Sequence, residues 1–222
     1  MALVEIRQLD AHTTRMGLWR MDESTEELYR LYPHLEALPM SYRSESRQKE
    51  YLCIRVLLSV MTGRQDLLID HLPSGKPVVD GFNISISHTR GYAALVLSRS
   101  EAVAVDIEYR SDRVGRIVHK FLLPEETSAL VGRTDDSLLS TECPDRPMPT
   151  TDDLLLAWSA KETLYKLHSS DRLDYFEMRC LQKDGSRIVL ENIKRGKVVS
   201  IPYKFTDDYV LTWAVEAVSA AE

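Results

Sequence analysis

The sequence lacks the features that mark several common protein classes. Its three cysteines, Cys53, Cys143 and Cys180, are odd in number and share no Cys-x-x-Cys spacing, so neither a disulfide framework nor a zinc site is indicated. No apolar run approaches the ~20 residues that a membrane helix requires. The amino terminus carries Glu5 and no long apolar segment, so it does not read as a signal peptide. We expect a protein of the reducing cytoplasm with no membrane partner.

An excess of basic charge is also missing. The formal net charge is −6, whereas proteins that bind nucleic acid are generally basic. The hydrophobic fraction of 44% and the charged fraction of 28% are ordinary for a globular protein, and 222 residues suffice for one large or two small domains. We expect no nucleic-acid partner, and an anionic ligand would have to be bound by a local group of cations.

Residues 102–109 predict a strand with two acids on one face. Apolar residues alternate there with small or acidic ones, which is the pattern of a half-buried strand. Residues two apart on a strand lie about 6.6 Å apart on the same face, so the carboxylates of Asp106 and Glu108 can converge. A divalent metal ion is the usual reason for such a pair. The alternative is a strand that leaves the core and ends in two solvated acids.

A basic helix is predicted over residues 42–61, because apolar residues recur there at helical spacing and Gly63 follows as a stop. Arg43 and Arg47 are four residues apart and should share a face. Arg55 lies inside an apolar run, so its guanidinium should meet an acid or a phosphate. A solvated basic face with one internal ion pair is the alternative.

Lys76, Ser87, His88 and Arg90 could form an anion-binding rim farther along the chain. Lys76 lies in a turn before Pro77, and His88 follows a predicted strand that ends in Ser87. The alternative is a structural histidine at a strand end.

A second strong helix is predicted over residues 154–167, preceded by capping residues from Thr151 onward. Trp158, Glu162 and Lys166 are spaced by four and fall along one stripe. A solvated pair of Glu162 with Lys166 is the plain alternative.

The rest of the chain predicts short strands, hairpins and one long exposed loop at residues 132–152. The strand at 102–109 should complete an antiparallel meander with the two strands before it. The carboxy-terminal half predicts two hairpins. Each half therefore offers a strong helix and a run of hairpin strands, although no repeat is visible as sequence identity. The predicted strands cover residues 2–9, 16–20, 92–98, 175–181, 187–190, 197–205 and 209–215.

Two of these segments together resemble the paired signature of the phosphopantetheinyl transferases. They are Val105-Asp106-Ile107-Glu108 and Trp158-Ser159-Ala160-Lys161-Glu162-Thr163-Leu164-Tyr165-Lys166. Gly75-Lys76-Pro77, Ile86-Ser87-His88 and the basic helix resemble further elements of the larger, surfactin-type branch. The resemblance implies an α+β monomer with two similar halves, 1–108 and 109–222, related by a pseudo-twofold axis. Each half would be a mostly antiparallel sheet packed with helices, with the active site at the seam.

The resemblance also implies an activity. The enzyme would move the 4′-phosphopantetheine arm of coenzyme A to a serine of an acyl or peptidyl carrier protein and release 3′,5′-ADP. Asp106, Glu108 and Glu162 would bind Mg²⁺ or Mn²⁺, and Asp106, Glu162 and Lys166 would be catalytic. Coenzyme A would be bound by Arg43, Arg47, Lys76, Ser87, His88 and Lys161.

Some residues depart from the family pattern. Ala104 stands where the family usually has glycine, Thr163 replaces a smaller residue, and His168–Arg172 replaces a frequent Gly-Lys-Gly. Two other functions stay open. A metal-dependent phosphodiesterase would need a histidine cluster, which the sequence does not show. A non-catalytic coenzyme A-binding relative would be expected to have lost one of the acids or Lys166.

Overall fold

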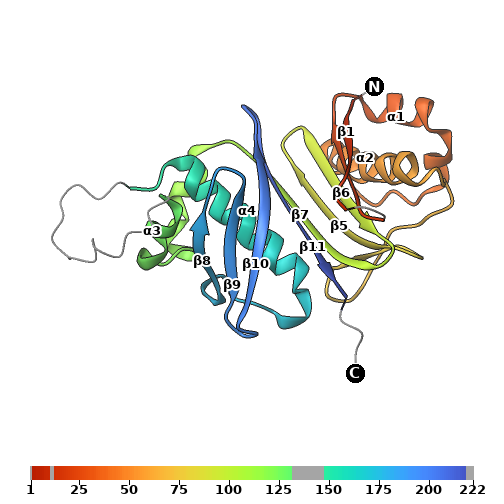
Figure 1. Ribbon diagram of the computed structural model, residues 1–222. Coiled ribbons are helices and arrows are strands. Elements are labelled where there is room, and N and C mark those ends of the chain that lie inside the picture. The colour runs from red at the N-terminus through yellow and green to blue at the C-terminus, as the bar shows by residue number, and fades with distance from the viewer. Residues whose placement is uncertain (1, 11–12, 132–147, 219–222) are drawn as a thin grey trace. The chain divides into compact units, whose positions relative to one another are not determined.

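The computed structural model describes residues 2–10, 13–131 and 148–218. They form a mixed α+β protein built on antiparallel sheets, which confirms the predicted fold class (Figure 1). The chain divides into two compact units, Met1–Ile107 with Val215–Glu222, and Glu108–Ala214. The sequence predicted halves of 1–108 and 109–222. A pseudo-twofold relation between the halves, with a site at their seam, stays a prediction.

The first unit contains a four-stranded antiparallel sheet in the order β1-β2-β6-β5, and β3 pairs with β4 in a small separate ladder. The strands expected near residues 2–9, 16–20 and 92–98 are all present. The bounds are β1 Leu3–Gln8, β2 Arg15–Arg20, β3 Asp70–His71, β4 Pro77–Val78, β5 Asn83–Thr89 and β6 Tyr92–Ser98.

Helix α2 (Glu45–Thr62) covers this sheet and contacts β2 and β6. Its apolar residues from Leu52 to Leu58, and Met61, are buried in the core of the unit. Gly17 of β2 allows the close approach, because a Cβ there would lie 2.5 Å from Met61 Sδ. The helix ends at the predicted Gly63, whose φ of 72° is left-handed. Helix α1 (Thr25–Leu31) begins with a capping box of Ser24 and Glu27, and η1 (Pro33–Ala37) follows it.

Strand β7 (Glu101–Tyr109) belongs to a five-stranded sheet in the order β7-β11-β10-β9-β8. The predicted meander of β5, β6 and β7 is therefore wrong. Side chains of β5 take the place of a backbone ladder, because Ser85 Oγ and Ser87 Oγ accept hydrogen bonds from the amides of Val105 and Ile107. The other strands are β8 Met178–Lys183, β9 Arg187–Asn192, β10 Lys197–Phe205 and β11 Tyr209–Ala217.

Helix α4 (Thr151–Leu167) packs against β8, β9 and β10 in the second unit (Figure 1). Its N-cap is Thr150, one residue earlier than expected, and Asp153 completes a capping box. Thr163 Oγ1 lies 2.6 Å from Thr212 Oγ1, so this departure from the family pattern has a buried hydroxyl partner on β11.

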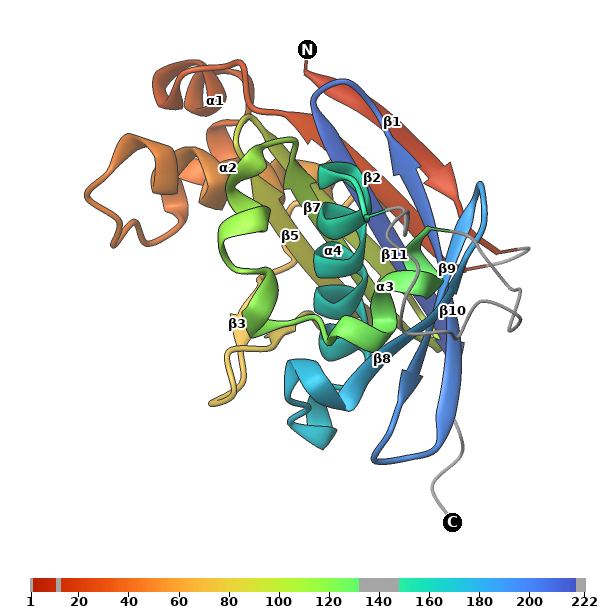
Figure 2. The same cartoon turned by 90° about the vertical axis from the view of Figure 1, so that its left-hand side faces the viewer.

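Short helical segments complete the second unit. Two of them, η2 and η3, are 3-10 segments that follow β7. Figure 2 shows α3 beside α4, which it contacts. The bounds are η2 Asp112–Arg116, η3 Val118–Lys120, η4 Pro124–Glu126, α3 Thr127–Leu130, η6 Ser169–Asp171 and η7 Tyr175–Glu177.

Cys53 and Cys180 are free and buried, and burial raises the pKa of the Cys53 thiol to about 12. In the part of the chain that the structure describes, no helix is both long and apolar enough to cross a membrane. Residues 132–147 of the predicted loop, with Cys143, lie outside the described residues.

Candidate active site

Asp106 lies on β7 in the first unit and is almost completely buried, with 3% of its surface exposed. The alternation of apolar and polar residues makes the strand, and β5 supplies a polar neighbour. Ser87 Oγ donates a hydrogen bond of 3.0 Å to Asp106 Oδ1 and also accepts one from the amide of Ile107. The strand and the serine together orient the carboxylate.

This arrangement gives Ser87 a task that the sequence did not suggest. A serine hydroxyl has one proton to donate, and here that proton goes to Asp106. A contact between Ser87 and a coenzyme A phosphate stays a prediction, and it would require the hydroxyl to turn away from the carboxylate.

Arg47 and His88, two of the predicted coenzyme A ligands, line one pocket of about 110 Å³ in the first unit. They come from α2 and β5, and Glu50 lies between them. Glu50 Oε2 is 2.7 Å from Arg47 Nη1 and 3.5 Å from His88 Nε2. The pocket therefore has a guanidinium from α2 and an imidazole from β5, both close to one carboxylate that a ligand phosphate could replace.

The same pocket has an aromatic wall. The rings of Tyr42 and Tyr51 lie 5.7 Å apart, and the Arg55 guanidinium lies 3.4 Å from the centre of the Tyr51 ring. Arg55 Nη1 also donates to the Tyr51 carbonyl. Burial lowers the pKa of Arg55, and interactions with the side chains of Tyr51, Tyr42 and Asp70 partly offset this effect. Asp70 is thus an acid that acts on the guanidinium, and a phosphate partner stays a prediction.

Arg43 is placed differently from the prediction, whereas Lys76 lies in a turn before Pro77 as predicted. Arg43 precedes the N-cap Ser44, so it is not on the helix and does not share a helical face with Arg47. Lys76 lies in the turn between β3 and β4, after Gly75 with φ 84°. Both side chains are exposed, and the residues that line the pocket include neither. Their binding to coenzyme A stays a prediction.

In the second unit, Glu108 and Glu162 are held by two stacked aromatic residues. Trp158 Nε1 donates to Glu108 Oε1 at 2.9 Å, and the Tyr175 hydroxyl donates to Glu162 Oε1 at 2.5 Å. The rings of Trp158 and Tyr175 stack, with centroids 5.1 Å apart and planes 29° apart. Motif spacing gave no signal for Tyr175, which was expected to begin a plain strand.

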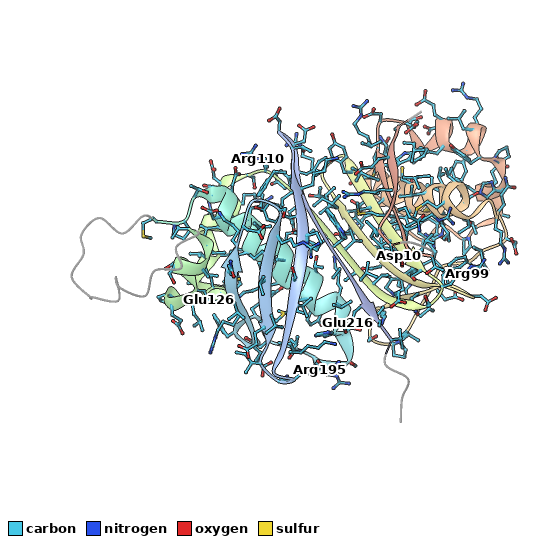
Figure 3. The ribbon with its side chains drawn as sticks, in the orientation of Figure 1. Asp10, Arg99, Arg110, Glu126, Arg195 and Glu216 are labelled. Carbon is cyan, nitrogen blue, oxygen red and sulfur yellow. The ribbon has the colours of Figure 1, made fainter. Side chains whose placement is uncertain are left out.

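Lys161 does not face a ligand, and its predicted phosphate contact is corrected to a structural role. Its side chain is 0% exposed, and its ammonium lies 2.9 Å from Glu126 Oε1. The carbonyls of Phe121 and Tyr175 accept hydrogen bonds from it at 2.6 and 3.1 Å. An ammonium has three donors, so these three partners satisfy it. Glu126, labelled in Figure 3, comes from η4 just ahead of α3.

Lys166 is half-buried and lies one turn after Glu162 on α4. It therefore stays a catalytic candidate.

A larger hollow of about 440 Å³ is lined by residues around Arg110 and Asp152, which form an ion pair. None of the predicted site residues lines that hollow.

The donor chemistry of the candidate site suits a hard divalent cation, because Asp106, Glu108 and Glu162 offer carboxylate oxygens. Asp106 belongs to the first unit and the two glutamates to the second. Across the described ranges, no three His, Cys, Asp or Glu side chains are gathered closely enough to hold a metal ion, so the joint ligand set stays a prediction.

Comparison with known proteins adds one finding. A family model described as the 4′-phosphopantetheinyl transferase superfamily matches residues 102–214, more than half of the 222-residue chain. The match includes Asp106, Glu108 and all of α4, and it excludes the pocket of Arg47 and His88. A search of curated proteins finds no match.

Proposed function

The chain belongs to the 4′-phosphopantetheinyl transferase superfamily, and from this premise we propose that it modifies an acyl or peptidyl carrier protein. The 4′-phosphopantetheine arm of coenzyme A passes to a serine of the carrier, and 3′,5′-ADP is released. We further assign the chain to the surfactin-type branch, because Gly75-Lys76-Pro77 and Ile86-Ser87-His88 precede the matched region.

One observation carries the proposal. The two motifs that resemble the family signature meet in the second unit, where Trp158 of the second motif donates to Glu108 of the first at 2.9 Å. Plain surface acids would not be expected to have indole partners from a helix 50 residues away. The contact supports a built site in which β7 and α4 act together.

Asp106, Glu108 and Glu162 would hold a Mg²⁺ ion. When bound, the ion neutralises charge on the coenzyme A diphosphate during phosphoryl transfer. The carboxylates suit this task because Mg²⁺ binds oxygen ligands together with substrate phosphates. Mn²⁺ has the same ligand preference and should substitute.

The other roles follow from residue chemistry. Glu162, directly or through a water molecule, accepts the proton of the carrier serine as its oxygen attacks the β-phosphorus. The bond from that phosphorus to the bridging oxygen breaks, and Lys166 stabilises charge on the departing phosphate. Arg47 and His88 bind coenzyme A phosphates at the pocket rim, and Arg43 and Lys76 approach the same ligand from exposed segments.

The test is to mix the protein with coenzyme A, Mg²⁺ and an apo carrier domain and to weigh the carrier by mass spectrometry. We expect a gain of one phosphopantetheinyl group that chelation of the metal abolishes. No gain, while coenzyme A still binds, would favour a non-catalytic relative. Release of free phosphopantetheine without modification of the carrier would favour a phosphodiesterase.

A further inference from the structure

Two aromatic residues of the second unit each hold one carboxylate of the candidate site. Trp158 donates its indole N–H to Glu108 and Tyr175 donates its hydroxyl to Glu162, at 2.9 and 2.5 Å. Because the two rings stack at 5.1 Å, the two donors are packed against each other. The stacked pair thus connects the positions of two carboxylates that come from a strand and a helix.

The stacked pair packs against buried groups, which are the Phe121 ring and the Lys161–Glu126 ion pair. Phe121, which is 0% exposed, packs edge-on against Trp158 with ring centroids 5.2 Å apart. Lys161 donates to the carbonyls of both Phe121 and Tyr175 while it pairs with Glu126. The ion pair therefore fixes the backbone at Tyr175, and the ring stack fixes its side chain.

We propose that Tyr175 is a positioning residue, which orients the Glu162 carboxylate for metal binding and catalysis and, through its stack on Trp158, sets Glu162 relative to Glu108. This inference rests on the proposed function of the site. Groups that hydrogen-bond a metal-binding carboxylate typically change metal affinity or activity by about 10–100-fold when they are removed. Tyr175 lies outside both motifs, so nothing in the sequence pattern identified it.

The competing explanation is that Tyr175 serves only in packing. Removal of its hydroxyl group distinguishes a packing role from a positioning role. If Tyr175 only fills space between Trp158 and the backbone, phenylalanine does the same. If it orients Glu162, loss of the single oxygen removes a hydrogen bond to a charged group while the stack stays in place.

The experiment compares Tyr175→Phe with Tyr203→Phe. The Tyr203 hydroxyl also donates at 2.5 Å, but to the carbonyl of Asp184 in a hairpin of the same unit. For Tyr175→Phe we expect kcat to fall about 10–100-fold, with the KM for coenzyme A unchanged. Calorimetric titration of Mg²⁺, with and without coenzyme A, should show weaker binding by a similar factor. The melting temperature should stay within a few degrees of the wild type, and Tyr203→Phe should be normal in all three measurements.

Trp158→Phe is a second variant, which keeps an aromatic ring but loses the donor to Glu108. It should weaken Mg²⁺ binding as well. Wild-type kcat and Mg²⁺ affinity in Tyr175→Phe would overturn the positioning role and leave the proposed function intact. A wild-type protein that binds Mg²⁺ yet modifies no carrier would instead overturn the proposed function, and the Mg²⁺ titration of Tyr175→Phe would still decide the role of Tyr175.

Discussion

The surroundings of Asp106 differ from those of Glu108 and Glu162. Asp106, in the first unit, is held by the hydroxyl of Ser87, a small group that can rotate. The two glutamates, in the second unit, are held by donors on large stacked rings that are packed against a buried ion pair. The donors to the two glutamates therefore come from packed aromatic rings, whereas the donor to Asp106 is a small hydroxyl of β5.

The cationic groups show the same contrast. The ammonium of Lys161 in the second unit is buried, and protein oxygens accept all of its hydrogen bonds. Arg47 and His88 instead line a pocket in the first unit, and both lie close to the carboxylate of Glu50. A partner that can be exchanged is what a binding site for a diffusible phosphate requires. The comparison separates a structural cation in the second unit from side chains in the first unit that we propose to bind a ligand.

The largest effect is expected for Glu162→Gln, which keeps the size of the side chain but removes its charge and its ability to accept a proton. We expect kcat for carrier modification to fall by about 10²–10⁴-fold, the range for loss of a general base. The measurement is single-turnover kinetics followed by mass spectrometry. Glu191→Gln, a change of the same type on β9, is the control and should keep wild-type kinetics. Activity above a tenth of wild type in Glu162→Gln would contradict the assignment.

Replacing Lys161 with methionine should act on stability. The change leaves Glu126 buried without its cation, and breaking a buried pair in this way costs about 3–5 kcal/mol. Denaturant unfolding of the variant measures the loss. Lys166→Met, five residues farther along the same helix, should lower kcat while the free energy of unfolding changes by less than about 1 kcal/mol. The opposite pattern, a stable Lys161→Met with poor coenzyme A binding, would restore the phosphate contact predicted from the sequence.

Two substitutions in the first-unit pocket should move coenzyme A binding in opposite directions. Arg47→Ala removes a cation and should raise the KM for coenzyme A about tenfold, the low end for a charge-assisted hydrogen bond. Glu50→Gln removes the carboxylate that competes with a phosphate and should lower the same KM a few-fold. Steady-state kinetics checks both. A rise of the KM in Glu50→Gln would show that Glu50 instead organises the pocket for its ligand.

The smallest effect concerns the start of α4. Burial raises the pKa of Asp153, but hydrogen bonds from Lys183 and Thr150 outweigh it and bring the pKa below its usual 3.8. A lowered pKa in the folded state stabilises the protein above the unfolded value, and this contribution is lost as the pH falls through the folded value. Asp153→Asn should therefore cost about 1 kcal/mol at pH 7, as for loss of a helix cap.

The difference in unfolding free energy between wild type and Asp153→Asn should shrink below about pH 4. Denaturant unfolding as a function of pH checks this, with the exposed Asp207→Asn as the control. A difference that does not change between pH 7 and pH 3 would show that charge on Asp153 contributes nothing.

Much of the fold could be predicted because local patterns were strong. The predicted strands match β6 and β10 at their observed bounds and β7 to within one residue, and Gly63 marked the end of α2. The strand that pairs with β7 could not be predicted. It is β11, whereas a meander with β5 and β6 was expected. Side-chain oxygens of Ser85 and Ser87 on β5 accept hydrogen bonds from amides of β7. Which strands pair depends on contacts far apart in the chain.

The candidate site was predicted in part for a similar reason. Motif spacing identified Glu108 and Trp158, and the structure brings them into contact. Spacing could not show that Lys161 is buried, because its partners Glu126 and Phe121 lie about 40 residues earlier in the chain. Tyr175 was missed because it belongs to no motif and its role depends on one hydroxyl. Residues whose function arises from packing give no periodic signal.

The central claim is that Asp106, held by a serine, and the two glutamates, held by aromatic residues, bind one metal ion together. Electron paramagnetic resonance of Mn²⁺ added to the protein with coenzyme A tests it most directly. We predict one bound Mn²⁺ per chain, with binding weakened at least about tenfold in each of Asp106→Asn, Glu108→Gln and Glu162→Gln. Wild-type Mn²⁺ affinity in Asp106→Asn, alongside lost affinity in the two glutamate variants, would contradict the claim.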